Sequence, residues 1–140
     1  MIDIRELRIG NYVQYHDTYM RMESLMYCDE WKIRLAPTRL KTVSINEVTP
    51  IILTNDLLIK CGFYKVGALL GTEIEVGIYH VSMKGYCLSL LDELGLMFCR
   101  CSGNDYAEYD DIIPICPVGY LHELQNLCFD LTRRELEVNL

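Results

Sequence analysis

The chain has 140 residues, of which 51% are hydrophobic and 24% are charged, and its net charge is -7. A chain of this length and hydrophobic content can bury a core of its own, which argues against a disordered protein. The N-terminus is charged from Asp3 onward, and no apolar run reaches the length of a signal peptide or a membrane span. We therefore expect a soluble, cytoplasmic protein with no membrane association.

The excess of negative charge lies entirely in the second part of the chain. Residues 1–50 hold seven basic and seven acidic side chains, whereas residues 51–140 hold six and thirteen. An acidic surface repels phosphate backbones, so direct binding to nucleic acid is disfavoured. The same skew motivates one alternative function, an acidic inhibitor that mimics DNA, although such mimics usually spread their acids over an extended face.

Four short β-strands are expected in the first fifty residues. Trp31, Ile33 and Leu35 alternate with polar residues and should share one face of a strand. Polar turns at residues 16–18 and 29–30 separate the neighbouring segments. The strands are expected at residues 12–16, 20–23, 31–35 and 40–43. Short strands with tight turns predict an SH3-like small β-barrel or meander over residues 1–48.

A boundary and a short helix follow. Pro50 restricts the residue before it and ends regular strand pairing. Thr54 can cap a helix over residues 55–61, and Gly62 stands where a left-handed residue would close it. Phe63 is then placed to fold back on Leu58.

An antiparallel sheet is expected next, with strands at residues 73–78, 86–91 and 96–99 and a hairpin loop at residues 92–95. An acidic stretch at residues 105–111 comes before the last helix, and residues 135–140 could add an edge strand. The whole is predicted to be an α+β protein, in which residues 49–140 form an α+β unit of helix, three-stranded sheet, acidic loop and helix.

The acidic stretch is interpreted first as a solvated loop. It lacks the Asp-x-Asp-x-Asp-Gly spacing of the common calcium loop. A partner interface is the alternative, and its candidate residues are Asp105, Glu108, Asp110 and Asp111.

The clearest periodic segment is the helix expected at residues 120–131. Its apolar residues gather on one arc of a width typical of a helix packed on a core. Phe129 falls on the opposite side, with His122 and Gln125. Either the tail or the N-terminal β-unit covers this aromatic ring, or the three residues form a stripe for a second chain. The stripe makes His122, Gln125 and Phe129 candidate interface residues.

Motifs at both ends of the chain carry a resemblance. The chain opens with LRIGNYV at residues 7–13, has ILT at 52–54 and CGF at 61–63, and ends with YLHELQNL at 120–127, LT at 131–132 and EL at 135–136. These segments resemble a family of small uncharacterised bacterial proteins found in gut-commensal genomes and their phages or mobile elements. That family usually has Tyr at the position of Cys128 and Gly at that of Arg133, so this chain lacks a glycine cap after Leu131. The resemblance implies a phage or mobile-element origin and no known activity.

No cofactor or metal motif is found in the sequence. The seven cysteines are an odd number in mostly apolar segments, which is typical of reduced, structural thiols. Cys99 and Cys101 with His80 are too few for a zinc site. His80 could pair with Cys87 or Cys99 as a nucleophilic couple, although a histidine on an apolar face is more often a hydrogen-bonded core residue.

The remaining catalytic patterns are weak. Glu73 and Glu75 could supply paired acids, but the alternation places both on the solvent face. No nucleophile elbow, phosphate loop or dinucleotide motif is present. We therefore favour a non-enzymatic interaction or accessory protein with a protein partner or a homo-oligomeric state. The alternative is a small hydrolase or transferase with a cleft between the two units.

Overall fold

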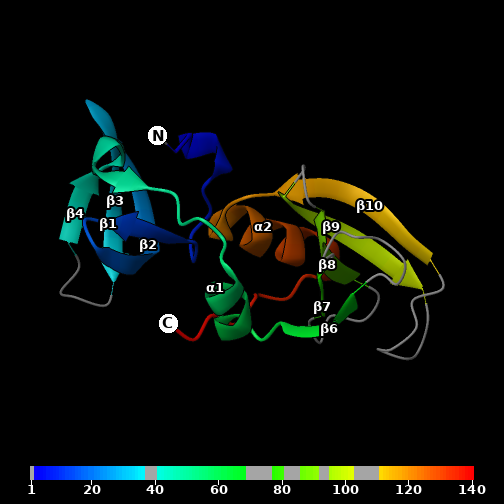
Figure 1. The fold of residues 1–140 in the computed structure, drawn as a ribbon. Coiled ribbons are helices and arrows are strands. Elements are labelled where there is room, and N and C mark those ends of the chain that lie inside the picture. The colour runs from blue at the N-terminus through cyan, green and yellow to red at the C-terminus, as the bar shows by residue number, and fades with distance from the viewer. Residues whose placement is uncertain (1, 37–40, 69–76, 81–85, 92–94, 103–110) are drawn as a thin grey trace. The chain divides into compact units, whose positions relative to one another are not determined.

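The computed structural model describes residues 2–36, 41–68, 77–80, 86–91, 95–102 and 111–140 (Figure 1). The chain forms two compact units, one of Met1–Leu53 with Tyr120–Leu136, and one of Thr54–Gly119 with Glu137–Leu140. The last helix therefore packs with the N-terminal strands, whereas the sequence had grouped it with residues 49–140. The α+β class is confirmed.

The first unit is built on a curled antiparallel sheet. Its strands are β1 (Tyr12–Tyr15), β2 (Thr18–Cys28), β3 (Glu30–Ala36), β4 (Lys41–Ser44) and β5 (Val48–Thr49), in the order β4-β3-β2-β1-β5. Short 3-10 turns, η1 (Ile4–Glu6) and η2 (Ile45–Glu47), precede β1 and β5. The four strands expected in this region are confirmed, and β2 is longer than predicted.

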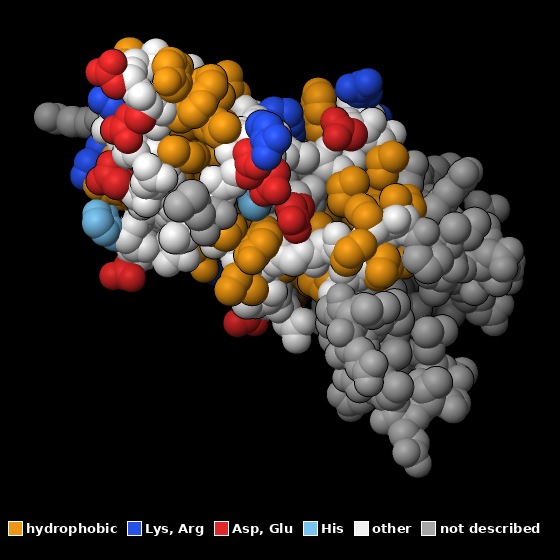
Figure 2. All heavy atoms as spheres, turned by 90° about the horizontal axis from the view of Figure 1, so that it is seen from above, with side chains coloured by type: hydrophobic (Ala, Val, Ile, Leu, Met, Phe, Trp, Pro, Cys, Tyr) orange, Lys and Arg blue, Asp and Glu red, His pale blue; other side chains and the backbone are white. Residues whose placement is uncertain are grey.

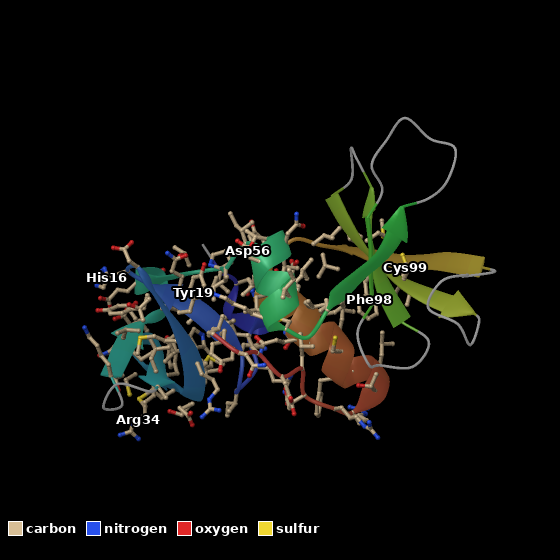
Figure 3. All side chains as sticks on the ribbon, turned by 60° about the horizontal axis from the view of Figure 1, so that its bottom comes forward. His16, Tyr19, Arg34, Asp56, Phe98 and Cys99 are labelled. Carbon is tan, nitrogen blue, oxygen red and sulfur yellow. The ribbon has the colours of Figure 1, made fainter. Side chains whose placement is uncertain are left out.

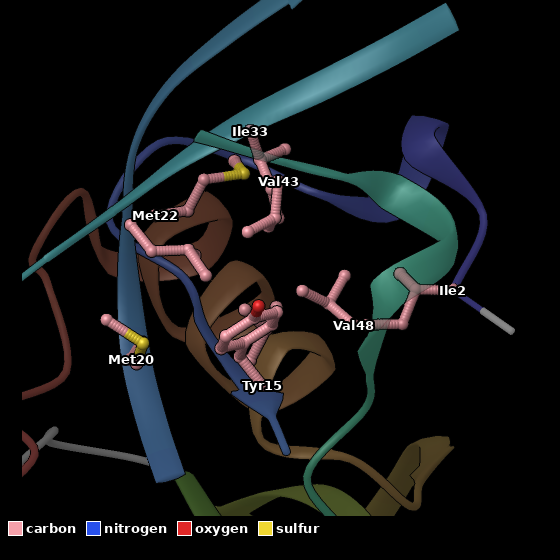
Figure 4. Packing of buried hydrophobic residues seen from close by; sticks show 9 residues of the cluster. Ile2, Tyr15, Met20, Met22, Ile33, Val43 and Val48 are labelled. Carbon is pink, nitrogen blue, oxygen red and sulfur yellow. The ribbon is translucent and has the colours of Figure 1, made fainter. Parts of the chain in front are cut away.

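A bulge in β2 decides which of its side chains face the core. Met20 and Met22 point inward, and the register with β3 then shifts between Met22 and Ser24. After this shift Leu25, opposite Ile33, packs against the core. Figure 4 shows side chains from several strands meeting in this core. Its buried members are Ile2, Val13, Tyr15, Met20, Met22, Ile33, Leu35, Val43 and Val48.

The final helix, α2 (Leu121–Thr132), belongs to this first unit, and its prediction is confirmed. Leu121, Leu124 and Cys128 are fully buried, and the Leu121 N–H donates to the Ile51 carbonyl. Tyr120, which was expected on the apolar arc, is instead the partly exposed N-cap residue. The buried side of the helix therefore includes His122 and Gln125, which periodicity had placed on its polar side.

The second unit contains a short helix, α1 (Asn55–Lys60), and a five-stranded antiparallel sheet. The strands are β6 (Tyr64–Ala68), β7 (Gly77–His80), β8 (Tyr86–Leu91), β9 (Gly95–Ser102) and β10 (Asp111–Val118), in the order β10-β9-β8-β7-β6. Phe98 and Cys99 on β9 are both buried (Figure 3). Strands β8 and β9 were predicted, whereas β6 and β10 were missed.

Strand β10 carries Pro114 and Pro117, residue types that argue against a central strand. It lies at the edge of the sheet and has a register shift between Pro114 and Cys116, the setting in which proline is tolerated. The strand predicted at residues 73–78 falls mostly outside the described residues. Residues 135–140, where an edge strand was expected, form none.

The predicted ends of α1 are confirmed. The Thr54 hydroxyl accepts from the Leu57 N–H at 3.2 Å, and Gly62 has a φ of 85°. The N–H groups of Gly62 and Phe63 donate to the carbonyls of Ile59 and Leu58, the bonds of a Schellman motif. Within the described residues, no helix is long and apolar enough to span a membrane.

Candidate functional site

Gln125 lies buried between α2 and the start of β1. Its side-chain oxygen accepts from the Tyr12 N–H at 2.9 Å, and its side-chain nitrogen donates to the Gly10 carbonyl at 3.1 Å. The amide therefore satisfies one donor and one acceptor of the N-terminal backbone, which would otherwise be buried without partners. Gly10 has a φ of 96°, so a residue that tolerates the left-handed region turns the chain into β1 at this point.

Asn126, the next residue, binds three groups of the N-terminal segment. Its nitrogen donates to the Glu6 carbonyl at 2.7 Å. Its oxygen accepts from the Asn11 side chain at 2.9 Å and from Arg8 Nε at 3.3 Å. Asn11 is itself fully buried, and its oxygen accepts from the Arg8 N–H at 2.7 Å. We call Arg8, Asn11, Gln125, Asn126 and Glu135 the polar clasp.

Arg8 also connects the N-terminal segment to Glu135, in the tail that follows α2. Its guanidinium donates to both carboxylate oxygens of Glu135, with 3.0 Å between Nη2 and Oε2. This hydrogen-bonded ion pair lowers the pKa of Glu135, and the same contact raises the pKa of Arg8. The LRIGN start and the YLHELQNL and EL tail segments, which carry the resemblance, thus bind one another within a single unit.

Phe129 lies beside the clasp. The Arg8 guanidinium carbon is 4.3 Å from the centre of its ring, and that of Arg133 is 5.8 Å away. Of the predicted stripe, His122 and Gln125 are buried at 1% and 2% exposure, and Phe129 is half-buried. The structure therefore brings the stripe together against the N-terminal segment, which is the intramolecular alternative that the sequence left open.

His122 differs from Gln125, because its buried side chain makes no hydrogen bond within the described residues. No hydrogen bond reaches either ring nitrogen from the described residues, and Nε2 lies 3.6 Å from Glu6 Oε2. Its ring stacks on Tyr120, with 5.8 Å between the centroids and 12° between the planes. The contacts that the structure shows for His122 are therefore mainly packing contacts.

The structure describes less of the other predicted site residues. Asp105, Glu108 and Asp110 lie outside the described residues, and Asp111 begins β10 with its side chain undescribed. The acidic-interface prediction is therefore untested. His80 pairs with Cys87 across β7 and β8, but the orientation of these two side chains is likewise undescribed.

The cysteines with described side chains form no disulfides. They are Cys28, Cys61, Cys99, Cys116 and Cys128. Burial raises the pKa of Cys61 to about 11, so that thiol is protonated and unreactive at neutral pH. Among the described residues, no group of three or more potential metal ligands was found.

One surface feature was missed from the sequence. The end of the β2–β3 hairpin exposes Tyr27 at 64% and Trp31 at 38%, opposite each other in the ladder. Their rings are 5.2 Å apart and inclined by 63°, an edge-to-face pair. We call Tyr27 and Trp31 the hairpin aromatic pair.

The hairpin aromatic pair is exposed because β2 and β3 extend beyond the neighbouring strands β1 and β4. β1 pairs with β2 only at residues 18–21, and β4 pairs with β3 only at residues 32–35. In Figure 1 the turn between β2 and β3 extends beyond the ends of β1 and β4. Alternation correctly predicted that Trp31 shares a face with Ile33 and Leu35. It did not predict that the neighbouring strands end before Trp31 and leave it exposed.

Comparisons with known proteins place this chain in no family, since no family model, curated protein or solved structure matches it. The site must therefore be judged on its geometry. The side chains of the polar clasp are engaged in hydrogen bonds that hold α2 to the N-terminal segment. The hairpin aromatic pair, by contrast, is exposed to solvent. The pair can supply apolar area and edge-to-face contacts to another molecule.

Proposed function

We propose that this chain is a non-enzymatic interaction protein whose first unit is an SH3-like small barrel. The five-strand meander supports this fold, because its last strand returns to pair with its first and a 3-10 turn precedes that last strand. The bulge in β2 supports it as well, since a bulge bends one strand so that it can serve both halves of a barrel. Such a fold hosts many functions, so the function rests on the surface.

The observation that carries the proposal is the hairpin aromatic pair. Large aromatic side chains are enriched at the centres of protein interfaces. Here two of them are preorganised against each other on a hairpin, so binding would cost little side-chain entropy. Figure 2 shows other hydrophobic side chains at the surface among charged ones, and these are common on any protein. The pair differs from them because its two rings contact each other edge to face.

Affinity capture from the native host tests this function. The tagged chain and a Tyr27→Ser/Trp31→Ser variant are compared, with Ile59→Ser as the control because Ile59 on α1, at 63%, is as exposed as Tyr27. We expect a captured protein that then binds the purified chain directly, with at least tenfold weaker binding to the double variant and unchanged binding to the control.

A captured protein that binds the parent and the double variant equally would contradict this role for the pair. Unfolding of the double variant in urea must match the parent closely, since both rings project past the core. The origin in bacteria, their phages or mobile elements is a proposal that rests on the resemblance of the terminal and middle motifs.

A further inference from the structure

The outer edge of the β2–β3 hairpin carries unpaired backbone groups. Residues 24–28 of β2 pair with β3 on one side. On the other side the pairing with β1 ends at Arg21, and the last backbone contacts are those of Met22 with Gly10 and Asn11. Within the described part of the chain, no strand lies along this edge past Met22. Every second residue of such an edge presents its N–H and C=O outward.

Past the bulge between Met22 and Ser24, this edge lacks most of the features that keep strand edges apart. Natural edges are short, bulged, or carry lysine, proline or inward charges. The other two edges of the same sheet fit that rule, since β5 has two residues and β4 has four and begins with Lys41. By contrast, Ser24-Leu25-Met26-Tyr27-Cys28 contains neither charge nor proline. Met26, at its centre, is 38% exposed.

We propose that a second copy of this chain pairs with residues 24–28 as an antiparallel strand centred on Met26. The pairing is self-complementary, because each Met26 meets the other, each Leu25 meets Tyr27, and each Ser24 meets Cys28. A two-fold axis generates such an isologous contact. No charged residue enters the five-residue ladder. Just outside it, Glu23 of one copy would lie opposite Asp29 of the other, and Arg21 Nη2, 2.6 Å from Glu23 Oε1, compensates the charge of Glu23.

The pairing would also complete the hairpin. A two-stranded ribbon is marginal in water, whereas four strands with an apolar face are stable. The two-fold axis perpendicular to the sheet keeps Leu25 and Tyr27 of both copies on one face. Each Tyr27 ring would then pack on Leu25 of the other copy, and the two hairpin aromatic pairs would share one surface. The inference therefore deepens the proposed function and rests on it.

Charge exchange at Met26 tests the register directly. Sedimentation equilibrium at tens of micromolar should show a dimer for the parent. Met26→Lys and Met26→Glu should each be monomeric, because like charges would face each other at the two-fold axis. An equimolar mixture of the two variants should form a heterodimer. A parent that sediments as a monomer would overturn the inference, and so would a dimer that survives Met26→Lys.

Cross-linking supplies the independent readout. Opposite residues in an antiparallel ladder have Cα atoms about 4.5–5.5 Å apart, which a disulfide can span. Met26→Cys in a Cys28→Ser background should therefore oxidise to a covalent dimer. Thr42→Cys in the same background, on the exposed strand β4, should stay monomeric. Dimerisation through Thr42→Cys alone would place the contact on the wrong edge.

The two proposals can fail separately. Met26→Lys keeps Tyr27 and Trp31, so its monomer still tests whether the hairpin aromatic pair binds another protein. Loss of the dimer with retained capture would support both proposals. A monomeric parent that still captures a partner through Tyr27 would reject self-pairing and leave the proposed function standing.

Discussion

Gln125 shows how a single side chain can replace a strand partner. It supplies an acceptor to Tyr12 and a donor to Gly10, two backbone groups at the point where the chain enters β1. Asn126 does the same for the Glu6 carbonyl. Because of these bonds, the polar side of α2 is buried against the N-terminal segment without leaving these backbone N–H and C=O groups unpaired. A polar residue on a helix is therefore not evidence of a solvent-facing side.

Replacing Gln125 by Leu keeps its bulk and removes both bonds. We expect the free energy of unfolding in urea to fall by about 2 kcal/mol, because a donor and an acceptor are left buried and unpaired. Gln14→Leu is the matched control, since Gln14 makes an exposed bond to the His16 carbonyl. Equal stability of the two variants would show that the bonds of Gln125 are dispensable.

At the scale of the element, α1 and α2 end in the same backbone conformation with different residues. Gly62 closes α1 at a φ of 85°, and Arg133 closes α2 at a φ of 59°. A side chain at positive φ is strained, although the Arg133 guanidinium gains a contact with Phe129 in exchange. The family that the chain resembles usually has Gly at this position, and the φ of Arg133 lies in the region that Gly favours.

Arg133→Gly should raise the free energy of unfolding by about 0.5–1 kcal/mol, because relief of the left-handed strain outweighs the lost ring contact. Arg134→Gly, at the next position, is the control and should be neutral or slightly destabilising. Urea midpoints at equal slope give the comparison. A destabilised Arg133→Gly would mean that the contact with Phe129 matters more than the backbone strain.

The two ends of α1 can be weighed against each other. Thr54→Ala should cost about 1 kcal/mol through loss of the bond to the Leu57 N–H. Gly62→Val should cost more, because a β-branched residue resists positive φ even though a Cβ at Gly62 would meet no atom within 4 Å. Gly62→Asn is the control and should cost less than Val. Urea midpoints that match the parent for all three variants would be inconsistent with this account.

At the scale of the whole molecule, the first unit is discontinuous in sequence. The strands come from the first 53 residues, while the helix that completes the unit lies in Tyr120–Leu136. The intervening residues fold as the second unit. Loop closure over such a length costs only modestly more than over a short loop, so this arrangement is thermodynamically acceptable. It does, however, mean that the strands in the first 53 residues depend on the helix in Tyr120–Leu136 to complete their unit.

A fragment of residues 1–53 should therefore fail to unfold cooperatively by circular dichroism. The Tyr12 N–H and the Gly10 carbonyl would lack the partners that α2 provides. Adding a peptide of residues 120–136 should restore a cooperative transition, and the same peptide with Gln125→Leu should restore it less well. Cooperative folding of residues 1–53 alone would instead support the predicted independent unit at residues 1–48.

Local patterns in the sequence were enough to determine many of the elements. Alternation identified β3 through Trp31, Ile33 and Leu35, and the residues at both ends of α1 were read correctly. These signals are local because strand alternation and helix capping involve residues a few positions apart. The edge strand β10 is the exception, since its two prolines disfavour a central strand but are tolerated in an edge strand.

Only the tertiary structure decided what the polar side of α2 and the end of the β2–β3 hairpin do. Gln125 bonds to Tyr12 and Gly10 across 113 and 115 positions, a distance in sequence that no local pattern records. In the same way, Trp31 has the alternation of a core residue, and it is exposed because the neighbouring strands stop short of it. Periodicity fixes which side chains share a face, while burial depends on which distant segment covers that face.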